Sequence, residues 1–140
     1  MKKLLVPVDG SATAVRALRH AIEMARAAGN VKIVIVNVQQ ALDHWYVGGL
    51  LNPEALAHLR QTGEAQAATA REVLDASGLN YEFRLLYGQP GEMIVREAHD
   101  ESCLGIVMGT RGLGDMQNLF LGSTAHKVIQ LAEVPVTLVK

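Results

Sequence analysis

The chain has 140 residues, a formal net charge of -1 and a hydrophobic fraction of 49%. This length suits one domain, residues 1–140, with a substantial core. The near-neutral charge argues against nucleic acid as a main partner, because binding a phosphate backbone needs a concentrated basic face.

The single cysteine, Cys103, cannot form an internal disulfide, so nothing points to an oxidising compartment. The apolar run near the N-terminus covers only residues 4–8 before Asp9 interrupts it, which is too short for a signal-peptide core. No stretch approaches the roughly 20 apolar residues of a membrane helix. We therefore expect a cytoplasmic protein without a membrane partner.

Short apolar runs alternate with amphipathic stretches along the whole chain. Residues 12–28, for example, carry Leu18, Ile22 and Ala25 at helical spacing, and Gly29 follows as a helix end. In chain order we predict strand 4–8, helix 12–28, strand 31–38, connection 39–52, helix 53–76, strand 81–87, a short helix after residue 90, strand 104–108, loop 109–121, a helix from residue 122 and strand 134–139.

Five predicted strands thus alternate with four predicted helices. Apolar strands joined by helices indicate an open parallel sheet with helices on both faces, which is an α/β fold. No linker or internal repeat divides the chain, so we expect a single domain.

A glycine-rich segment, residues 109–124, carries the strongest functional signal. It starts where the fourth strand ends, and in open α/β sheets ligands bind outside the carboxyl ends of the strands. Glycines there allow close approach of the backbone to a ligand and positive φ angles. The free N–H groups of Ser123, Thr124 and Ala125 at the next helix start would form an anion site. The segment therefore predicts phosphate binding, whereas the alternative is that Ser123 only caps the helix and the glycines only serve the turn.

Two common phosphate-binding motifs do not fit this segment. A Walker A loop would close with Gly-Lys-Ser or Gly-Lys-Thr, but Lys127 lies four residues beyond Ser123. A dinucleotide fingerprint would need a third glycine where Gln117 stands. Neither motif describes the loop.

The spacing Gly109-x2-Gly112-x9-Gly122-Ser123 resembles the ATP-binding signature of the universal stress protein family. Residues 6–11 are similar to the first strand and turn of that family, and residues 134–139 to its last strand. The resemblance spans essentially the whole chain. It implies a five-stranded parallel sheet of order 3-2-1-4-5, with ATP across the carboxyl ends of the first and fourth strands.

The resemblance also implies where the nucleotide lies. Asp9 would contact the ribose or the adenine, Val38 would line the adenine pocket, and Gly109 would approach the ribose. The phosphates would be held by Gly112, Gly122, Ser123 and Thr124. Mg²⁺ would arrive with the nucleotide and be bound through the phosphates. The predicted nucleotide-binding set is Pro7, Val8, Asp9, Val38, Met108, Gly109, Arg111, Gly112, Gly122, Ser123 and Thr124.

Several of these residues have simpler interpretations. Asp9 could be a helix N-cap or a turn aspartate, and Arg111 could be solvated rather than paired with a phosphate. His126 could act in phosphate or proton transfer, but surface histidines are common; we assign no catalytic residue and no protein metal site. The apolar segment 44–51 could be a lid, a partner-binding patch, or a loop packed onto its own domain.

The last strand, Val134 to Val139, would lie at the edge of the sheet, where an apolar strand invites pairing with a second copy. The family commonly dimerises there, so we expect a homodimer; the alternative is an edge protected by Pro135 and Lys140. The predicted function is a nucleotide-dependent stress-response sensor or regulator, with an unknown protein partner. Alternatives are a slow ATPase or autophosphorylating enzyme, and a protein interaction module without nucleotide.

Overall fold

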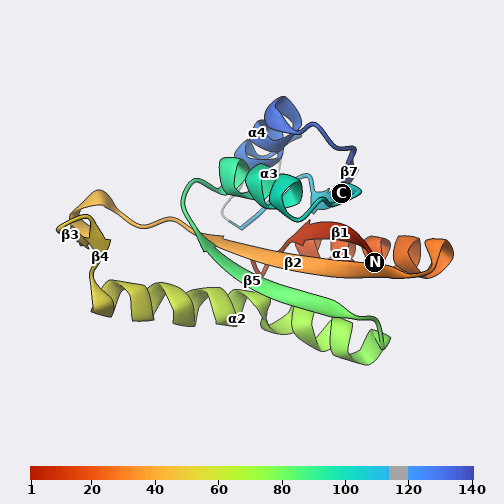
Figure 1. The fold of residues 1–140 in the computed structure, drawn as a ribbon, viewed down its shortest axis with the longest axis horizontal. Helices are drawn as coiled ribbons and strands as arrows, with labels where there is room; N and C mark the ends of the chain where they lie inside the picture. Colours follow the sequence, from red (N-terminus) through yellow and green to blue (C-terminus); the bar gives the residue numbers. More distant parts are fainter. Residues whose placement is uncertain (114–119) are drawn as a thin grey trace.

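The computed structural model describes residues 1–113 and 120–140, and its main feature is a five-stranded parallel sheet (Figure 1). The strand order is β5-β2-β1-β6-β7. Counted along the chain, these five strands have the order 3-2-1-4-5, so the predicted α/β architecture is confirmed. The strands are β1 (Lys2–Pro7), β2 (Val31–Gln39), β5 (Tyr81–Tyr87), β6 (Gly105–Gly109) and β7 (Val136–Val139).

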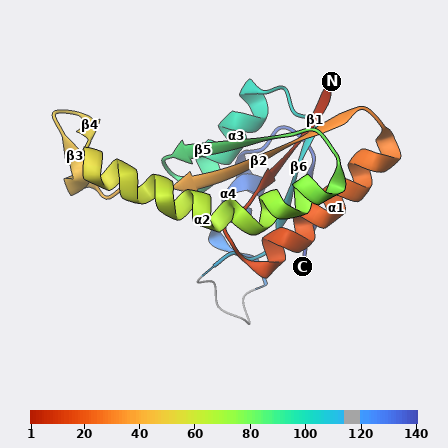
Figure 2. The ribbon, with the colours of Figure 1, turned by 90° about the horizontal axis from the view of Figure 1, so that it is seen from below.

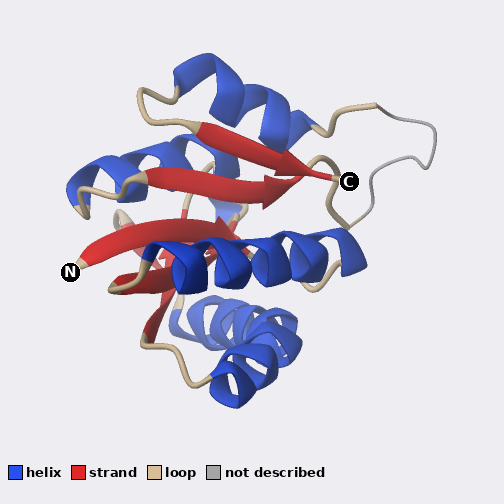
Figure 3. Cartoon of the chain, turned by 90° about the vertical axis from the view of Figure 1, so that its right-hand side faces the viewer, coloured by secondary structure: helices blue, strands red, loops and turns tan. Residues whose placement is uncertain are grey.

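Two layers of helices cover the sheet. Helices α1 (Ala12–Ala28) and α2 (Pro53–Ser77) lie on one face, and α3 (Pro90–Asp100) and α4 (Ser123–Leu131) lie on the other (Figure 1). Figure 3 shows the strands between these layers with their arrowheads pointing the same way. Within these described residues, no helix combines the length and hydropathy needed to span a bilayer.

Residues 33–36 of β2 form an unbroken apolar run because both faces of the strand are covered. Ile33 and Ile35 are buried against the α1–α2 layer, while Val34 and Val36 are buried against the α3–α4 layer. Successive side chains of a strand point to opposite faces, so a strand covered on both faces has no polar positions to offer solvent. The two helix layers therefore each have a separate apolar core.

Helix α2 approaches the sheet unusually closely at Gly63. A β-carbon on Gly63 would lie 2.9 Å from Asn37 Oδ1 and would collide with the Leu85 side chain. Only glycine therefore permits this packing distance between α2 and the strands β2 and β5. The close approach brings the next turn of α2 within reach of polar side chains on β2.

Two details of the C-terminal elements differ from the sequence prediction. Strand β7 begins at Val136 rather than Val134; Pro135 has no N–H to donate, and its carbonyl accepts a hydrogen bond from Ile106 N (2.9 Å). In α4, the helical spacing of Ala125, Val128 and Ile129 predicts that all three point inward; Ala125 and Val128 are buried, but Ile129 is 46% exposed. The apolar face of this nine-residue helix is therefore narrower than its sequence suggests.

The connection between β2 and α2 contains structure that the sequence analysis did not anticipate. A 3-10 turn, η1 (Asp43–Trp45), precedes a hairpin of β3 (Tyr46–Val47) and β4 (Leu50–Leu51). Gly48 and Gly49 form its turn with φ angles of 58° and 81°, which glycine adopts without strain. The hairpin lies beyond the N-terminal end of α2, at the far left of Figures 1 and 2.

Cys103 lies just before β6 and is buried in the core of the α3–α4 layer. Burial raises the pKa of its thiol to about 11, because the apolar surroundings disfavour the thiolate. Its neighbours in that core include Ala98 on α3 and Ile106 on β6. The side chain therefore fills space as a small apolar group.

Candidate functional site

A pocket of about 300 Å³ opens at the carboxyl ends of β1, β2 and β6. This volume lies at the lower end of the range typical of small-molecule sites. Every residue of the predicted nucleotide-binding set lines it, so the structure brings together positions from four separate parts of the sequence. These residues are Pro7, Val8, Asp9, Val38, Met108, Gly109, Arg111, Gly112, Gly122, Ser123 and Thr124.

The pocket also has lining residues that sequence reasoning missed. Thr110 and Leu113 lie inside the glycine-rich segment and could have been included on that ground. Gln66 lies in the middle of a long helix, where no local pattern marks it. The full set of missed residues is Ala14, Val36, Gln66, Pro90, Ile94, Thr110 and Leu113. Ala125, whose N–H group the sequence assigns to the anion site, also lines the pocket.

Backbone hydrogen bonds fix both ends of the glycine-rich segment. Thr110 N donates to Val139 O at the end of β7 (2.9 Å), and Gly122 N donates to Thr110 O (2.6 Å). The second bond brings the chain back beside its starting point before α4 begins. Residues 114–119 of the predicted loop lie outside the described residues.

Close packing, rather than left-handed backbone, accounts for the glycine at position 109. A β-carbon on Gly109 would lie 2.6 Å from Thr13 Cγ2 on α1. Gly122 has φ -69°, a value that any residue adopts, so the expectation of positive φ does not hold there.

The N-terminus of α4 opens into the pocket, and its N-cap residue, Gly122, has no side chain to cap it. Gly122 occupies the N-cap position and makes no capping hydrogen bond, so Ser123 is the first helical residue and not the cap. By contrast, the Ser11 hydroxyl caps α1 by accepting a hydrogen bond from Ala14 N (3.1 Å). The three pocket-lining residues that begin α4, Ser123, Thr124 and Ala125, thus present the positive end of the helix dipole to the cavity.

Asp9 ties two loops of the site together. Its Oδ1 accepts a hydrogen bond from Ser11 N (2.9 Å), which is the arrangement of a turn aspartate. Its Oδ2 accepts from Leu113 N (2.9 Å) in the glycine-rich segment. Asp9 therefore has the turn role considered above and not that of an N-cap, which Ser11 fills, and it also anchors the start of the glycine-rich segment beside β1.

Other candidate groups differ in their relation to the pocket. Arg111 is half-buried and lines it, whereas His126 is exposed and is not part of the lining. None of the residues 39–52 lines it either, so the hairpin is not placed as a lid in this structure. Val47 and Leu50 of the hairpin are 67% and 76% exposed, so they do not pack onto the domain. In the described part of the chain, no group of three or more His, Cys, Asp or Glu residues could hold a metal ion.

Three amide side chains, Asn37, Gln39 and Gln66, form what we call the amide cluster at the edge of the pocket. Asn37 is 1% exposed, and its Nδ2 donates to Val8 O and to Gln66 Oε1, both at 2.9 Å. Gln39 Nε2 donates to Asn37 Oδ1 (2.7 Å) and to Gln66 Oε1 (3.0 Å). The cluster thus connects the ends of β1 and β2 with α2.

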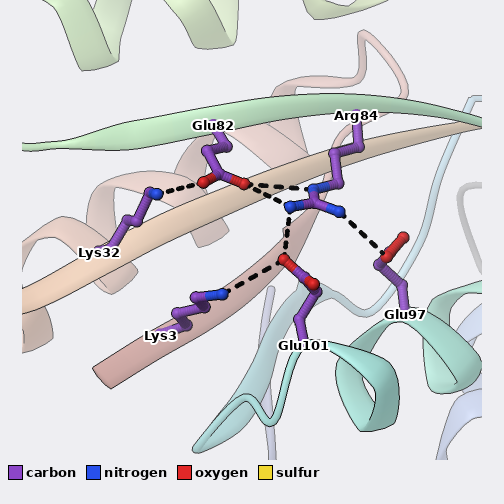
Figure 4. Close-up of polar contacts among 6 residues, drawn as sticks. All are labelled: Lys3, Lys32, Glu82, Arg84, Glu97 and Glu101. Atoms are coloured by element: carbon purple, nitrogen blue, oxygen red, sulfur yellow. Dashed lines mark hydrogen bonds and ion pairs between the residues drawn. The ribbon is translucent and has the colours of Figure 1, made fainter. Parts of the chain in front are cut away.

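A second polar group, which we call the charge cluster, lies on the face of the sheet that α3 and α4 cover, and its two lysines stand near the amino ends of β1 and β2 (Figure 4). Figure 4 shows Arg84 of β5 between three carboxylates, with Glu82 Oε2 at 2.6 Å and Glu97 Oε1 at 3.7 Å. None of its members lines the pocket. They are Lys3, Lys32, Glu82, Arg84, Glu97 and Glu101.

The carboxyl group of Glu82 has a strongly lowered pKa. Hydrogen bonds from Lys32 and then from Arg84 lower its pKa from the ordinary value of 4.5 to about 2. The same interactions join β2 and β5, and Arg84 extends the network to α3 through Glu97 and Glu101. The charge cluster therefore acts within the fold and not at the pocket.

Comparison with known proteins finds the same fold and sequence pattern elsewhere. Residues 1–140 match the profile of the universal stress protein family. The chain is 37% identical over 140 residues to a Thermus aquaticus universal stress protein encoded in the QAH/OAS sulfhydrylase 3' region, covering 99% of this chain and 98% of that protein.

Solved structures agree with this assignment. The structure of MJ0577 of Methanocaldococcus jannaschii superposes with a TM-score of 0.84 at 26% identity, covering 99% of this chain and 95% of the other. A universal stress protein from Archaeoglobus fulgidus in complex with dAMP superposes with a TM-score of 0.73 at 28% identity, covering 100% and 98%. The match of sequence profile, relatives and fold over essentially the full length leads to one conclusion: this chain belongs to the universal stress protein family.

Proposed function

We propose that this protein is a cytoplasmic stress-response regulator that binds ATP in the pocket and signals through nucleotide occupancy. The single observation that carries the proposal is the N-terminus of α4, which begins after a glycine N-cap and faces a pocket of about 300 Å³. The Archaeoglobus fulgidus relative in complex with dAMP supports an adenine nucleotide as the ligand.

The lining residues suit the two ends of a nucleotide differently. The backbone N–H groups of Ser123, Thr124 and Ala125 suit phosphate oxygens, and Arg111 adds a positive charge on the same side. Val38 and Met108 supply apolar surface suited to a base. Mg²⁺ would be bound by phosphate oxygens and water, because hard cations prefer oxygen ligands.

Slow turnover of the bound ATP is part of the proposal. A fast ATPase needs a group that positions or deprotonates the attacking water. Asp9 is the one carboxylate among the described lining residues, and both its oxygens accept backbone hydrogen bonds. Such a site favours binding over rapid hydrolysis, so occupancy would be the signal.

Calorimetry with Mg·ATP tests this proposal on the wild type and on Gly122→Val. We expect wild-type binding with a Kd on the order of micromolar and no detectable binding by the variant. The φ of -69° at Gly122 is open to valine, so the branched side chain would act by blocking the phosphates rather than by straining the backbone.

Ala68→Val is a suitable control, because it adds the same side chain at an exposed position of α2 outside the pocket. This control should bind as the wild type does. A wild-type protein with a normal thermal transition and no heat of binding would reject the ATP assignment.

We further propose that β7 pairs with β7 of a second copy to form a homodimer. β7 is an edge strand, and Leu138 on it is 37% exposed. The carbonyls of Pro135 and Val139 accept hydrogen bonds from residues beside β7 in the same chain. Because peptide groups alternate in direction along a strand, those of Val136 and Leu138 face the open edge.

Leu138→Pro tests the dimer, because it removes an N–H group that faces the open edge and leaves the pairing with β6 intact. Light scattering should give twice the chain mass for the wild type and for the control Leu138→Val, and the chain mass for Leu138→Pro. Equal masses for Leu138→Pro and the wild type would argue against pairing through β7.

A further inference from the structure

The orientation of the Gln66 amide is determined by the backbone carbonyl of Val8, to which it is connected through the side chain of Asn37. Val8 O can only accept a hydrogen bond, so the group of Asn37 that contacts it must be the amide nitrogen. That nitrogen also contacts Gln66 at 2.9 Å, so the Gln66 atom there must be the acceptor, Oε1. The oxygen and nitrogen atoms of the two amides are thus assigned from their hydrogen-bond partners, and not from the outline of the side chains.

Gln39 reinforces the same orientation. Its Nε2 donates to Asn37 Oδ1 and to Gln66 Oε1, so Gln66 Oε1 accepts from two separate N–H donors. Turning the Gln66 amide over would bring its nitrogen against two other nitrogens and lose both bonds. Gln66 is therefore held with its oxygen in the amide cluster.

As a consequence, Gln66 Nε2 takes no part in the hydrogen bonds of the amide cluster. Among the described residues, Gln66 Nε2 has no hydrogen-bond acceptor, although the side chain borders the pocket. Gly10, directly after Asp9, lies against its stem, since a β-carbon on Gly10 would be 3.6 Å from Gln66 Cγ. Gln66 thus has two N–H donors available for a ligand, and its amide cannot turn over to present the oxygen instead.

Gln66 lies at the end of the pocket away from the proposed phosphate site. It contacts side chains of β2, whereas α4 follows β6, and β1 separates these two strands in the sheet. Two strand spacings amount to roughly 10 Å, about the span from the phosphates of a nucleotide to its base. An N–H donor at this end would face the nucleoside.

We propose that Gln66 donates a hydrogen bond to a ring nitrogen of the adenine base and thereby sets the preference of the site for that base. This inference rests on the proposed function, since it assumes that an adenine nucleotide occupies the pocket. Because Gln66 Oε1 is already engaged, the residue recognises only an acceptor on the base and disfavours a base that presents an N–H group there.

A binding cycle between protein and ligand tests the contact directly. Mg·ATP and its 1-deaza, 3-deaza and 7-deaza analogues, each of which replaces one ring nitrogen by C–H, are titrated into the wild type and Gln66→Met. One analogue should bind the wild type roughly three- to tenfold more weakly than ATP because of the lost hydrogen bond. For Gln66→Met, the same analogue and ATP should bind equally well.

The variant is expected to fold, because Asn37 keeps its bond to Val8 O and Gln39 keeps its bond to Asn37 Oδ1. Gln61→Met, an exposed position of α2 outside the pocket, is the matched control and should show the wild-type pattern for every analogue. Equal losses in the wild type and Gln66→Met for all three analogues would overturn the inference while leaving ATP binding intact. A wild type that does not bind ATP would overturn the proposed function and this inference together.

Discussion

The amide cluster and the charge cluster solve the same problem, polar side chains packed against a buried sheet, in different ways. The charge cluster pairs opposite charges: Glu82 contacts Lys32 and Arg84, and Glu101 contacts Lys3 and Arg84. The amide cluster uses neutral groups whose donors and acceptors match only in one arrangement. The first is partly open to solvent at the edge strand β5, whereas Asn37 in the second is buried.

The comparison shows how location decides what a polar network can do. Ion pairs that solvent screens contribute little to the free energy of unfolding. A long charged side chain can also pair with another group when its partner is removed. A buried amide that loses its hydrogen-bond partner lowers stability strongly. The buried amides therefore hold the side chains of their cluster in one arrangement. The amide cluster borders the pocket, where a fixed donor is useful, and the charge cluster joins β1, β2, β5 and α3 at a distance from it.

Removing the central amide should give the larger effect on stability. Asn37→Leu keeps the number and branching of the side-chain heavy atoms, but it leaves Val8 O without its Asn37 donor and removes one of the two acceptors of Gln39 Nε2. We expect the free energy of unfolding to fall by about 2 to 4 kcal/mol, measured by urea denaturation.

The matched control for this comparison is Asn80→Leu, which makes the same change at an exposed position before β5. It should alter the free energy of unfolding by less than about 0.5 kcal/mol. If Asn37→Leu were as mild as Asn80→Leu, the amide cluster would not hold its geometry as we describe.

Neutralising a carboxylate of the charge cluster should give the smaller effect, and one that depends on pH. Glu82→Gln should lower the free energy of unfolding at pH 7 by at most about 1 kcal/mol, because solvent screens the pair. The lowered pKa of Glu82 means that the unfolded chain takes up its proton first as pH falls. The contribution is therefore complete above pH 4.5 and lost as pH falls toward 2, so the difference between wild type and variant should vanish over that range in urea titrations.

The two clusters should also differ in how their contributions to stability respond to salt. At 1 M NaCl the Debye length falls to about 3 Å, so the effect of Glu82→Gln should shrink while that of Asn37→Leu stays the same. Glu72→Gln, at an exposed position of α2, controls for the loss of one charge. An Asn37→Leu effect that weakened with salt as much as that of Glu82→Gln would remove the distinction between the clusters.

Much of the site could be predicted because its residues lie in continuous segments at strand ends. The parallel sheet brings the carboxyl ends of β1, β2 and β6 to one edge, so residues 7–9, Val38 and the glycine-rich segment meet there once the strand order is known. The hairpin could also have been anticipated, since Gly48-Gly49 between Tyr46-Val47 and Leu50-Leu51 is a two-residue hairpin pattern.

Gln66 could not be predicted, because its position depends on tertiary packing. In the sequence it is one polar residue among many on α2. It reaches the pocket because Gly63, one turn earlier, lets the helix approach Asn37 and Leu85 so closely. The role of Gln66 therefore depends on the contact of α2 with β2 and β5, which are distant in the sequence, and no local pattern encodes that contact.

The buried thiol of Cys103 has a practical consequence for all these experiments. Disulfide-exchange reagents react with the thiolate, which the folded protein barely forms at neutral pH because the pKa is about 11. Since the chain has no other cysteine, the labelling rate would report how often the core beneath α3 opens. A ligand that binds only the closed form would slow that labelling in proportion to its occupancy, so the protein carries its own reporter of binding without an added fluorophore.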